Sequence, residues 1–226
     1  MGFVIQDSYT KGLIGTLQEE VLSALSEAAN RVRSRQADAA VTRWFGDTSD
    51  ATRNHIQRSL SRMRTILNCE QIQLGFTSLK KVTAGGATSL VRGGSNAAAQ
   101  RSTSGLRPLN STLPSYAGAG FHQSNMWLDE GFNRLPKYLP LAGGAIDSSG
   151  WNQSKFNTIV HELSHLLLGT VDCVDGAGNT QYGAQRAEAL ALHGITYAHY
   201  NPPFAALHNA ENWGIFVEAA GRNKGT

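Results

Sequence analysis

Phe156–Leu168, FNTIVHELSHLLL, is the stretch that decides the fold of this chain. Its apolar residues recur at three- and four-residue spacing, which predicts a helix buried along one side. Gly169 follows directly and is typical of a helix end. His161 and His165 are four residues apart, so they lie one turn apart on the same face of that helix. Both imidazoles can therefore bind one metal ion.

Glu162 gives this H-E-x-x-H pattern its chemistry, because it is placed to take a proton from a metal-bound water. Neutral imidazoles, one oxygen ligand and a water suit a catalytic zinc ion. The pattern arises by chance in roughly one in a hundred chains of this length. Two histidines and a glutamate on a buried helix also need polar partners. The motif therefore favours a metal site over a helix with incidental histidines.

Several downstream residues are candidates for the third ligand. A third histidine at the spacing H-E-x-x-H-x-x-G-x-x-H is excluded, since leucine and valine stand at 168 and 171. Glu188 follows at a distance that some zinc peptidases use. Asp172 lies closer, where the turn after the helix can return its carboxylate to the metal. Asp175 is a rival oxygen ligand, and Cys173 is a sulfur alternative.

The amino-acid composition and charge limit the classes of function that this chain could have. The chain has 226 residues, of which 41% are hydrophobic and 16% charged, with a formal net charge of +3. Eight arginines fall between 31 and 64, which indicates either a nucleic-acid patch or a solvated helical face. Seven acids share residues 1–66 and favour the solvated face. No apolar stretch is long enough to span a membrane, and no secretory signal begins the chain.

Periodicity predicts one α+β domain over 1–226. A helix is expected to start in a capping box at Thr16 and Glu19, and Asn209 is expected to cap the last helix. Alternating apolar residues at 70–76 predict a strand, and 125–132 is interpreted as an edge strand. The predicted parts are helical 1–68, strands with Gly/Ser-rich loops over 69–150, and the H-E-x-x-H and C-terminal helices over 151–226.

The sequence resembles the aspzincins, the deuterolysin-like zinc endopeptidases. Their signature of H-E-x-x-H, then G-T-x-D, then Y-G is similar to HELSH, GTVD (169–172) and Tyr182-Gly183 here. The family's closing N-A-D-x-aromatic segment is similar to Asn209–Trp213, NAENW. An early Trp-Phe-Gly at 44–46 also matches the family's N-terminal half.

The resemblance implies a zincin-like fold and one Zn²⁺ per chain, with Glu162 as the catalytic base and Tyr182 steadying the tetrahedral intermediate. It also implies a role in substrate binding for Glu211 and Trp213. Gly214 stands where lysine-specific members have a second acid, so a preference for lysine is not implied. The implied zinc ligands are His161, His165 and Asp172.

Besides Gly214, the sequence differs from the family by an insertion. Residues 173–181 separate Asp172 from Tyr182, whereas the family's tyrosine comes three residues after its ligand. This insertion contains Asp175, so the choice between the two aspartates stays open, with Asp172 preferred because it completes G-T-x-D.

The predicted function is a zinc-dependent endopeptidase that is a monomer and acts on a protein or peptide, with the substrate extended along the strand at 125–132. No nucleic acid is expected. The alternatives are a basic, non-catalytic module that binds nucleic acid or an anionic surface, and an effector or toxin peptidase with one protein substrate. Because the family is usually secreted, we expect an exported protein. Cys69 and Cys173 then form a bridge, or otherwise remain two thiols.

Overall fold

The computed structural model describes residues 2–5, 8–69, 72–76, 82–84, 87–89, 97–100, 125–128, 130–150, 152–192 and 204–222. The helices are α1 (Ser8–Ile14), α2 (Leu17–Arg33), α3 (Asp38–Phe45), α4 (Asp50–Cys69), α5 (Glu130–Arg134), α6 (Lys155–Leu168), α7 (Ala184–Leu192), α8 (Phe204–His208) and α9 (Ala210–Gly221). The strands are β1 (Phe3–Ile5), β2 (Ile72–Phe76), β3 (Val82–Ala84), β4 (Ala87–Ser89), β5 (Ala97–Gln100), β6 (Asn125–Leu128), β7 (Leu141–Ala142) and β8 (Ala145–Ile146).

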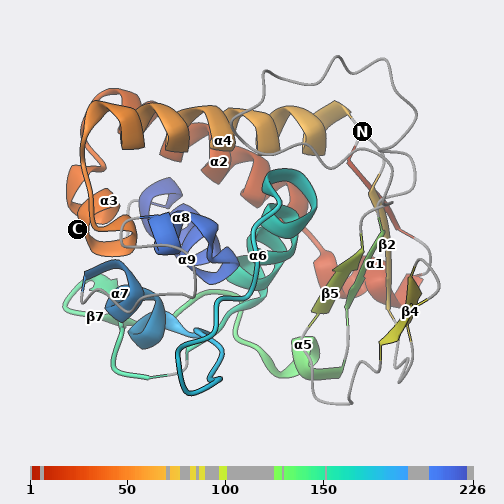
Figure 1. Cartoon of the computed structure of the whole chain (residues 1–226). Helices are drawn as coiled ribbons and strands as arrows, with labels where there is room; N and C mark the ends of the chain where they lie inside the picture. Colours follow the sequence, from red (N-terminus) through yellow and green to blue (C-terminus); the bar gives the residue numbers. More distant parts are fainter. Residues whose placement is uncertain are drawn as a thin grey trace.

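A small mixed sheet stands on one side of the helices (Figure 1). Its strand order is β1-β2-β6-β5. β1 and β6 pair with β2 in parallel, whereas β5 pairs antiparallel with β6. Two further antiparallel pairs, β3-β4 and β7-β8, are separate from it. The fold is therefore α+β, with most of the described residues in helices.

The interpretation of 125–132 as an edge strand was wrong. β6 covers only 125–128 and lies between β2 and β5, and the helix α5 begins at Glu130. Glu130 and Gly131 belong to this helix rather than to an exposed strand. At this side of the sheet the outer strand among the described residues is β5, which packs against α6.

Helices α6 and α9 pack against each other at the centre, and α2 and α4 run side by side over them (Figure 1). The core joins distant parts of the chain. Phe45, at the end of α3, lies 5.0 Å between ring centroids from both Trp213 and Phe216 of α9. Such tilted aromatic pairs each contribute about 0.5–1.5 kcal/mol beyond their buried area.

Both ends of α6 carry residues that are typical of helix termini. The Ser154 hydroxyl accepts a hydrogen bond from the Asn157 backbone N–H at 2.9 Å, which caps the N-terminus. Gly169 ends the helix in the left-handed region with a φ of 70°. Of the fourteen residues of α6, all but Lys155 and His165 are buried. The H-E-x-x-H pattern is therefore placed in the interior of the protein.

The predicted caps are not formed as expected. Thr16 precedes α2 but makes no side-chain cap hydrogen bond, and its hydroxyl donates to Glu20 instead. Asn209 precedes α9, also without a side-chain cap bond. Its amide group binds the loop that carries Cys173 and Gln181. Within the described ranges, no helix has the length and apolarity needed to cross a membrane.

A buried carboxyl, Glu218, joins α9 to the start of α6. It accepts hydrogen bonds from the Ser154 hydroxyl and the Leu139 backbone N–H, both at 2.6 Å, and pairs with Arg222 at 3.0 Å. Burial raises the pKa of Glu218 to about 7 against the lowering effect of these partners. Because the folded-state pKa is raised, this carboxyl stabilises the fold most at acidic pH, and that contribution is lost as pH rises through about 7.

Candidate metal centre

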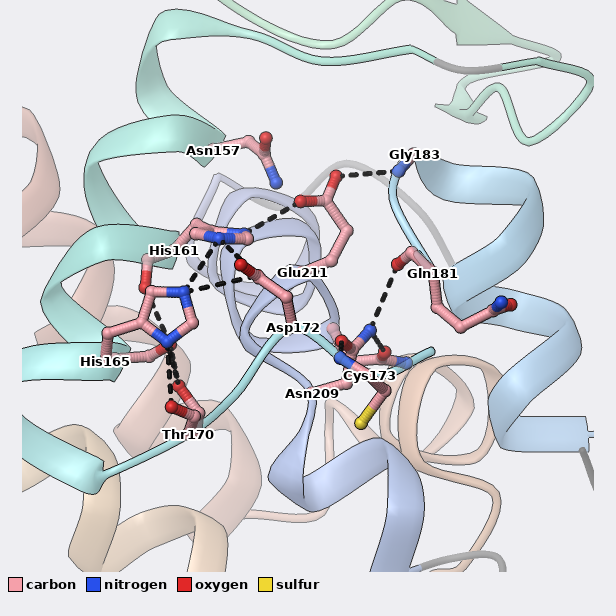
Figure 2. Close-up of polar contacts among 12 residues, drawn as sticks. Asn157, His161, His165, Thr170, Asp172, Cys173, Gln181, Gly183, Asn209 and Glu211 are labelled. Atoms are coloured by element: carbon pink, nitrogen blue, oxygen red, sulfur yellow. Dashed lines mark hydrogen bonds and ion pairs between the residues drawn. The ribbon is translucent and has the colours of Figure 1, made fainter. Parts of the chain in front are cut away.

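Three side-chain atoms, from α6 and the turn that follows it, converge on one point (Figure 2). The Nε2 atoms of His161 and His165 lie 3.1 Å apart, and Asp172 Oδ1 lies 3.0 Å and 3.2 Å from them respectively. Tetrahedral zinc with ligands at about 2.0–2.1 Å requires ligand atoms about 3.3 Å apart. The triangle of atoms is thus close to the size that a single zinc ion would need.

The hydrogen bonds of the two imidazoles explain why this triangle suits a cation. Nδ1 of His161 lies 2.9 Å from Glu211 Oε2, and Nδ1 of His165 lies 2.8 Å from the carbonyl oxygen of Thr170. Because both partners are acceptors, both Nδ1 atoms carry the ring hydrogen and both Nε2 atoms present lone pairs.

Asp172 completes the site with an orphaned oxygen. Among the described residues, no hydrogen-bond donor reaches its buried Oδ1 atom, although two ring nitrogens face it. With both imidazoles neutral, three lone pairs meet at this point and repel one another, and without a metal ion only a proton on His161, which its raised pKa favours, would relieve this. A divalent cation at their centre removes that repulsion, so the donor set fits zinc, for which two imidazoles and one carboxylate are ordinary ligands.

The turn after α6 aims Asp172 back at the helix. Thr170 is fixed there, because its hydroxyl lies 2.7 Å from the Ser164 hydroxyl and its carbonyl accepts from His165. Val171 then pairs with the segment before α9, with backbone bonds to His208 and Ala210. These bonds explain the glycine and threonine of GTVD: glycine turns the chain, and threonine locks it to the helix.

Local charges shift the pKa values at the centre. Burial raises the pKa of Glu162, and the nearby imidazoles of His161 and His165 only partly offset this. Burial disfavours the charged form of Asp172, but its two histidine partners outweigh burial and hold its pKa well below the usual range. Burial likewise lowers the pKa of His161, yet the carboxylates of Asp172 and Glu211 raise it well above its usual value.

Tyr182 lies beside the triangle. Its ring centroid is 5.7 Å from that of His161, and its hydroxyl is close enough to Asp172 for that carboxylate to affect its pKa. Burial and the nearby carboxylates raise the pKa of this phenol far above its usual value, so it stays a hydrogen-bond donor. Gly183 follows with a φ of 79°, a conformation that favours glycine, and its N–H donates to Glu211 at 3.1 Å.

The insertion between Asp172 and Tyr182 forms a small hairpin. Val174 bridges Thr180 in antiparallel fashion, and the Gln181 N–H donates to the Cys173 carbonyl at 2.7 Å. The extra residues form the hairpin, and the two ends of the insertion, Cys173 and Gln181, lie next to each other. The insertion therefore leaves the aspartate and the tyrosine in contact, as the shorter spacing of the aspzincins would.

Asn209 holds the base of this hairpin and was interpreted from sequence only as a helix cap. Its Oδ1 accepts from the Cys173 N–H at 3.1 Å, and its Nδ2 donates to the Gln181 carbonyl at 3.2 Å (Figure 2). The contacted residues are the immediate neighbours of Asp172 and Tyr182. No spacing rule in the sequence predicts this role.

The rival oxygen ligands are engaged elsewhere. Asp175 turns its carboxylate onto its own hairpin, where it accepts from the backbone N–H groups of Ala177 and Asn179 and from the Asn179 side chain. Glu188 forms a two-pronged pair with Arg43, at 3.1 Å and 3.3 Å. The metal-binding group found among the described residues contains neither acid.

Cys173 is a buried free thiol, so of the two alternatives, a bridge to Cys69 or a thiol, the structure has the thiol at Cys173. Its sulfur lies 3.7 Å from the Ala205 carbonyl oxygen. Burial, with a smaller effect of Asp172, raises the pKa of this thiol to about 12. A protonated thiol directed at a carbonyl is not a thiolate ligand, so the sulfur alternative also loses its support.

The two residues expected to contact substrate are enclosed. Glu211 and Trp213 are each 0% exposed. Both carboxylate oxygens of Glu211 are bound within the protein, and the Trp213 indole N–H donates to the Leu207 carbonyl at 2.8 Å. Neither side chain can reach a peptide at the surface, so the expected substrate role is not supported for either residue. The missed signal was the apolar run 213–217 that directly follows Glu211 and Asn212, because it buries the helix and a buried acid requires internal donors.

Among solved structures, the chain is similar to a zinc peptidase from Grifola frondosa. The TM-score is 0.58, and the match covers 94% of this chain and 96% of that one. The chain has the fold of a zinc peptidase. At 18% sequence identity this likeness shows the fold alone. No family model matches the sequence, and a search of curated proteins gives no match.

Proposed function

We propose that this chain is a zinc-dependent endopeptidase of the aspzincin type, with one zinc held by His161, His165 and Asp172. The observation that carries the proposal is a triangle of two ring nitrogens and one carboxylate oxygen, 3.0–3.2 Å apart. The oxygen, Asp172 Oδ1, is buried and has no hydrogen-bond partner among the described residues. The shared fold with a zinc peptidase supports the same conclusion independently of the motif.

Zinc, when bound, lowers the pKa of water toward neutrality and polarises a peptide carbonyl. Glu162 is proposed as the general base that takes the proton from that water and returns it to the leaving amine. Its buried position supports this, since burial raises the pKa of the carboxyl and makes it a stronger base than a surface glutamate. Its place beside His161 on the helix brings it to the same centre.

Tyr182 is proposed as the donor to the oxyanion that develops on the substrate carbonyl. Two features support this role. The raised pKa keeps the phenol protonated, and the hydroxyl already lies at Asp172, next to the histidine triangle. As the reaction proceeds, the hydroxyl would leave Asp172 and donate its hydrogen bond to the oxyanion.

The substrate is proposed to be an extended protein or peptide segment that pairs with the outer strand β5. β5 replaces 125–132 in this role, because β6 is paired on both sides and β5 lies against α6. A peptide along β5 would run past the helix that carries His161 and Glu162.

The alternative of a basic binding module gains nothing from the structure. Arg53 pairs with Asp38 at 2.9 Å, and Arg43 is committed to Glu188 and to the Ile146 carbonyl. An effector peptidase with one protein substrate would use the same chemistry. We also propose a single domain over 1–226, because one buried apolar cluster extends from Ile14 to Ala220. A monomeric state and export remain proposals.

Metal analysis combined with a cleavage-site profile tests this function. We expect about one zinc per chain in the purified protein. Internal bonds in a mixed peptide pool should be cut, a chelator should stop cleavage, and added zinc should restore it. A protein that holds zinc, is folded and cuts nothing in a broad pool would count against the peptidase assignment. A protein that holds no metal after incubation with zinc would count against the site itself.

A further inference from the structure

The first turn of α9 carries polar side chains that are completely enclosed. Asn209, Glu211 and Asn212 each have 0% exposure. Asn212 donates to the backbone carbonyls of Trp44 and Ala187, so its amide ties α3 and α7 to α9. Glu211 differs from its neighbours because it joins two parts of the metal centre to each other.

Glu211 contacts two groups with its two oxygens (Figure 2). Oε2 lies 2.9 Å from Nδ1 of His161, and Oε1 accepts from the Gly183 N–H at 3.1 Å. Gly183 follows Tyr182 directly in the chain. A single buried carboxylate therefore connects the first histidine of the triangle to the segment that carries the tyrosine.

We propose that Glu211 is a positioning residue, which holds His161 in the Nδ1–H tautomer and fixes the Tyr182 segment beside it; this inference rests on the zinc site proposed above. An imidazole presents a lone pair at Nε2 only when Nδ1 carries the hydrogen. An acceptor at Nδ1 selects that tautomer, and partners of this kind orient metal-binding histidines.

His165 shows the same arrangement with a different acceptor. Its Nδ1 atom faces the backbone carbonyl of Thr170 at 2.8 Å, which no side-chain substitution removes. Substitution of Glu211 is therefore the way to change the acceptor at a ring Nδ1 of the triangle, here that of His161, and so to test its tautomer. The alternative role, contact with a basic substrate side chain, is opposed by the enclosure of Glu211 and by the use of both its oxygens.

Glutamine at this position creates a specific conflict. A carboxylate offers acceptors to both the imidazole and the Gly183 N–H, whereas an amide has one oxygen and one NH₂ group. If the amide oxygen faces Gly183, its NH₂ faces Nδ1 and favours the tautomer whose Nε2 carries a hydrogen. If the amide is turned over, the Gly183 N–H meets a donor and Tyr182 is displaced.

The test compares zinc affinity in wild type, Glu211→Gln and Glu218→Gln, by competition with a chromophoric chelator. Glu211→Gln should weaken zinc binding about 10–100-fold, the range for the loss of an outer partner of a ligand. Glu218→Gln is the matched control, since it also removes an enclosed carboxylate from α9. It should keep wild-type zinc affinity, while it lowers thermal stability and removes the pH dependence of that stability near pH 7.

Nitrogen NMR of the His161 ring in zinc-loaded wild type supplies a readout that does not depend on a variant. We expect a hydrogen on Nδ1, protected from exchange, and metal on Nε2. Metal on Nδ1 would overturn the inference, and so would wild-type zinc affinity in Glu211→Gln. If that variant fails to fold, the wild-type spectrum alone decides. Absence of zinc binding by wild type would instead overturn the proposed function.

Discussion

Replacing Glu162 by Gln should reduce peptide cleavage by at least ~100-fold, the low end of what a general base contributes. Glutamine keeps the size of the side chain but has no basic oxygen. Glu162 does not belong to the triangle of His161, His165 and Asp172, so zinc content and folding should stay close to wild type. The measurement is the cleavage rate on a peptide substrate, with zinc content determined on the same samples.

Glu188→Gln is a suitable control for that experiment. Glu188 is an acid of the neighbouring helix α7 and is paired with Arg43. Its substitution should lower stability modestly and leave the cleavage rate nearly unchanged. A Glu162→Gln protein that holds zinc and cleaves at close to the wild-type rate would refute the proposed role of Glu162.

Asp172→Ala should weaken zinc binding by more than the ~10–100-fold typical of losing an outer partner, because it removes a direct oxygen ligand. Asp175→Ala should leave the affinity nearly unchanged. The Asp175 carboxylate accepts hydrogen bonds from Ala177 and Asn179, so its loss should loosen only the tip of the hairpin. Equilibrium competition for zinc, with folding checked by circular dichroism, measures both effects.

The opposite pattern would show that the ligand assignment is wrong. If Asp175→Ala lost the metal and Asp172→Ala kept it, the hairpin would have to rearrange on zinc binding. Equal and small losses in both variants would place the zinc away from this turn altogether.

Much of the helical fold could be predicted from local pattern. The apolar period of three and four residues predicts α2, α4 and α6, although α6 is buried on nearly all sides and not along one side as expected. Gly169 marks the end of α6 for a physical reason, since the left-handed turn there suits glycine. The predicted strand at 70–76 and the helix after Tyr182 also correspond to β2 and α7.

The pairing of strands could not be predicted in the same way. Whether β6 is an edge or an interior strand depends on β5, which comes from a different part of the chain. The interpretation of 125–132 took its glycine and acids as signs of an exposed strand, whereas Gly131 and Glu130 belong to a separate helix. Residues 101–124, within the region predicted to hold Gly/Ser-rich loops, lie outside the described residues.

The candidate site likewise has features that local sequence predicts and features that depend on tertiary packing. The spacing of His161 and His165 follows from helix geometry, so the sequence alone brings them together. The position of Asp172 depends on a turn that local residues fix, and the sequence favoured it without deciding. The roles of Asn209 and Glu211 arise only when α9 packs on α6, because their partners come from three different segments of the chain.

Anomalous diffraction at the zinc absorption edge, on crystals of zinc-loaded protein, tests the central claim most directly. We predict one strong peak per chain, about 2.0–2.2 Å from Nε2 of His161, Nε2 of His165 and a carboxylate oxygen of Asp172. A peak at Cys173, at Asp175 or at any other position would contradict the account, as would the absence of a peak between the two histidines after zinc loading.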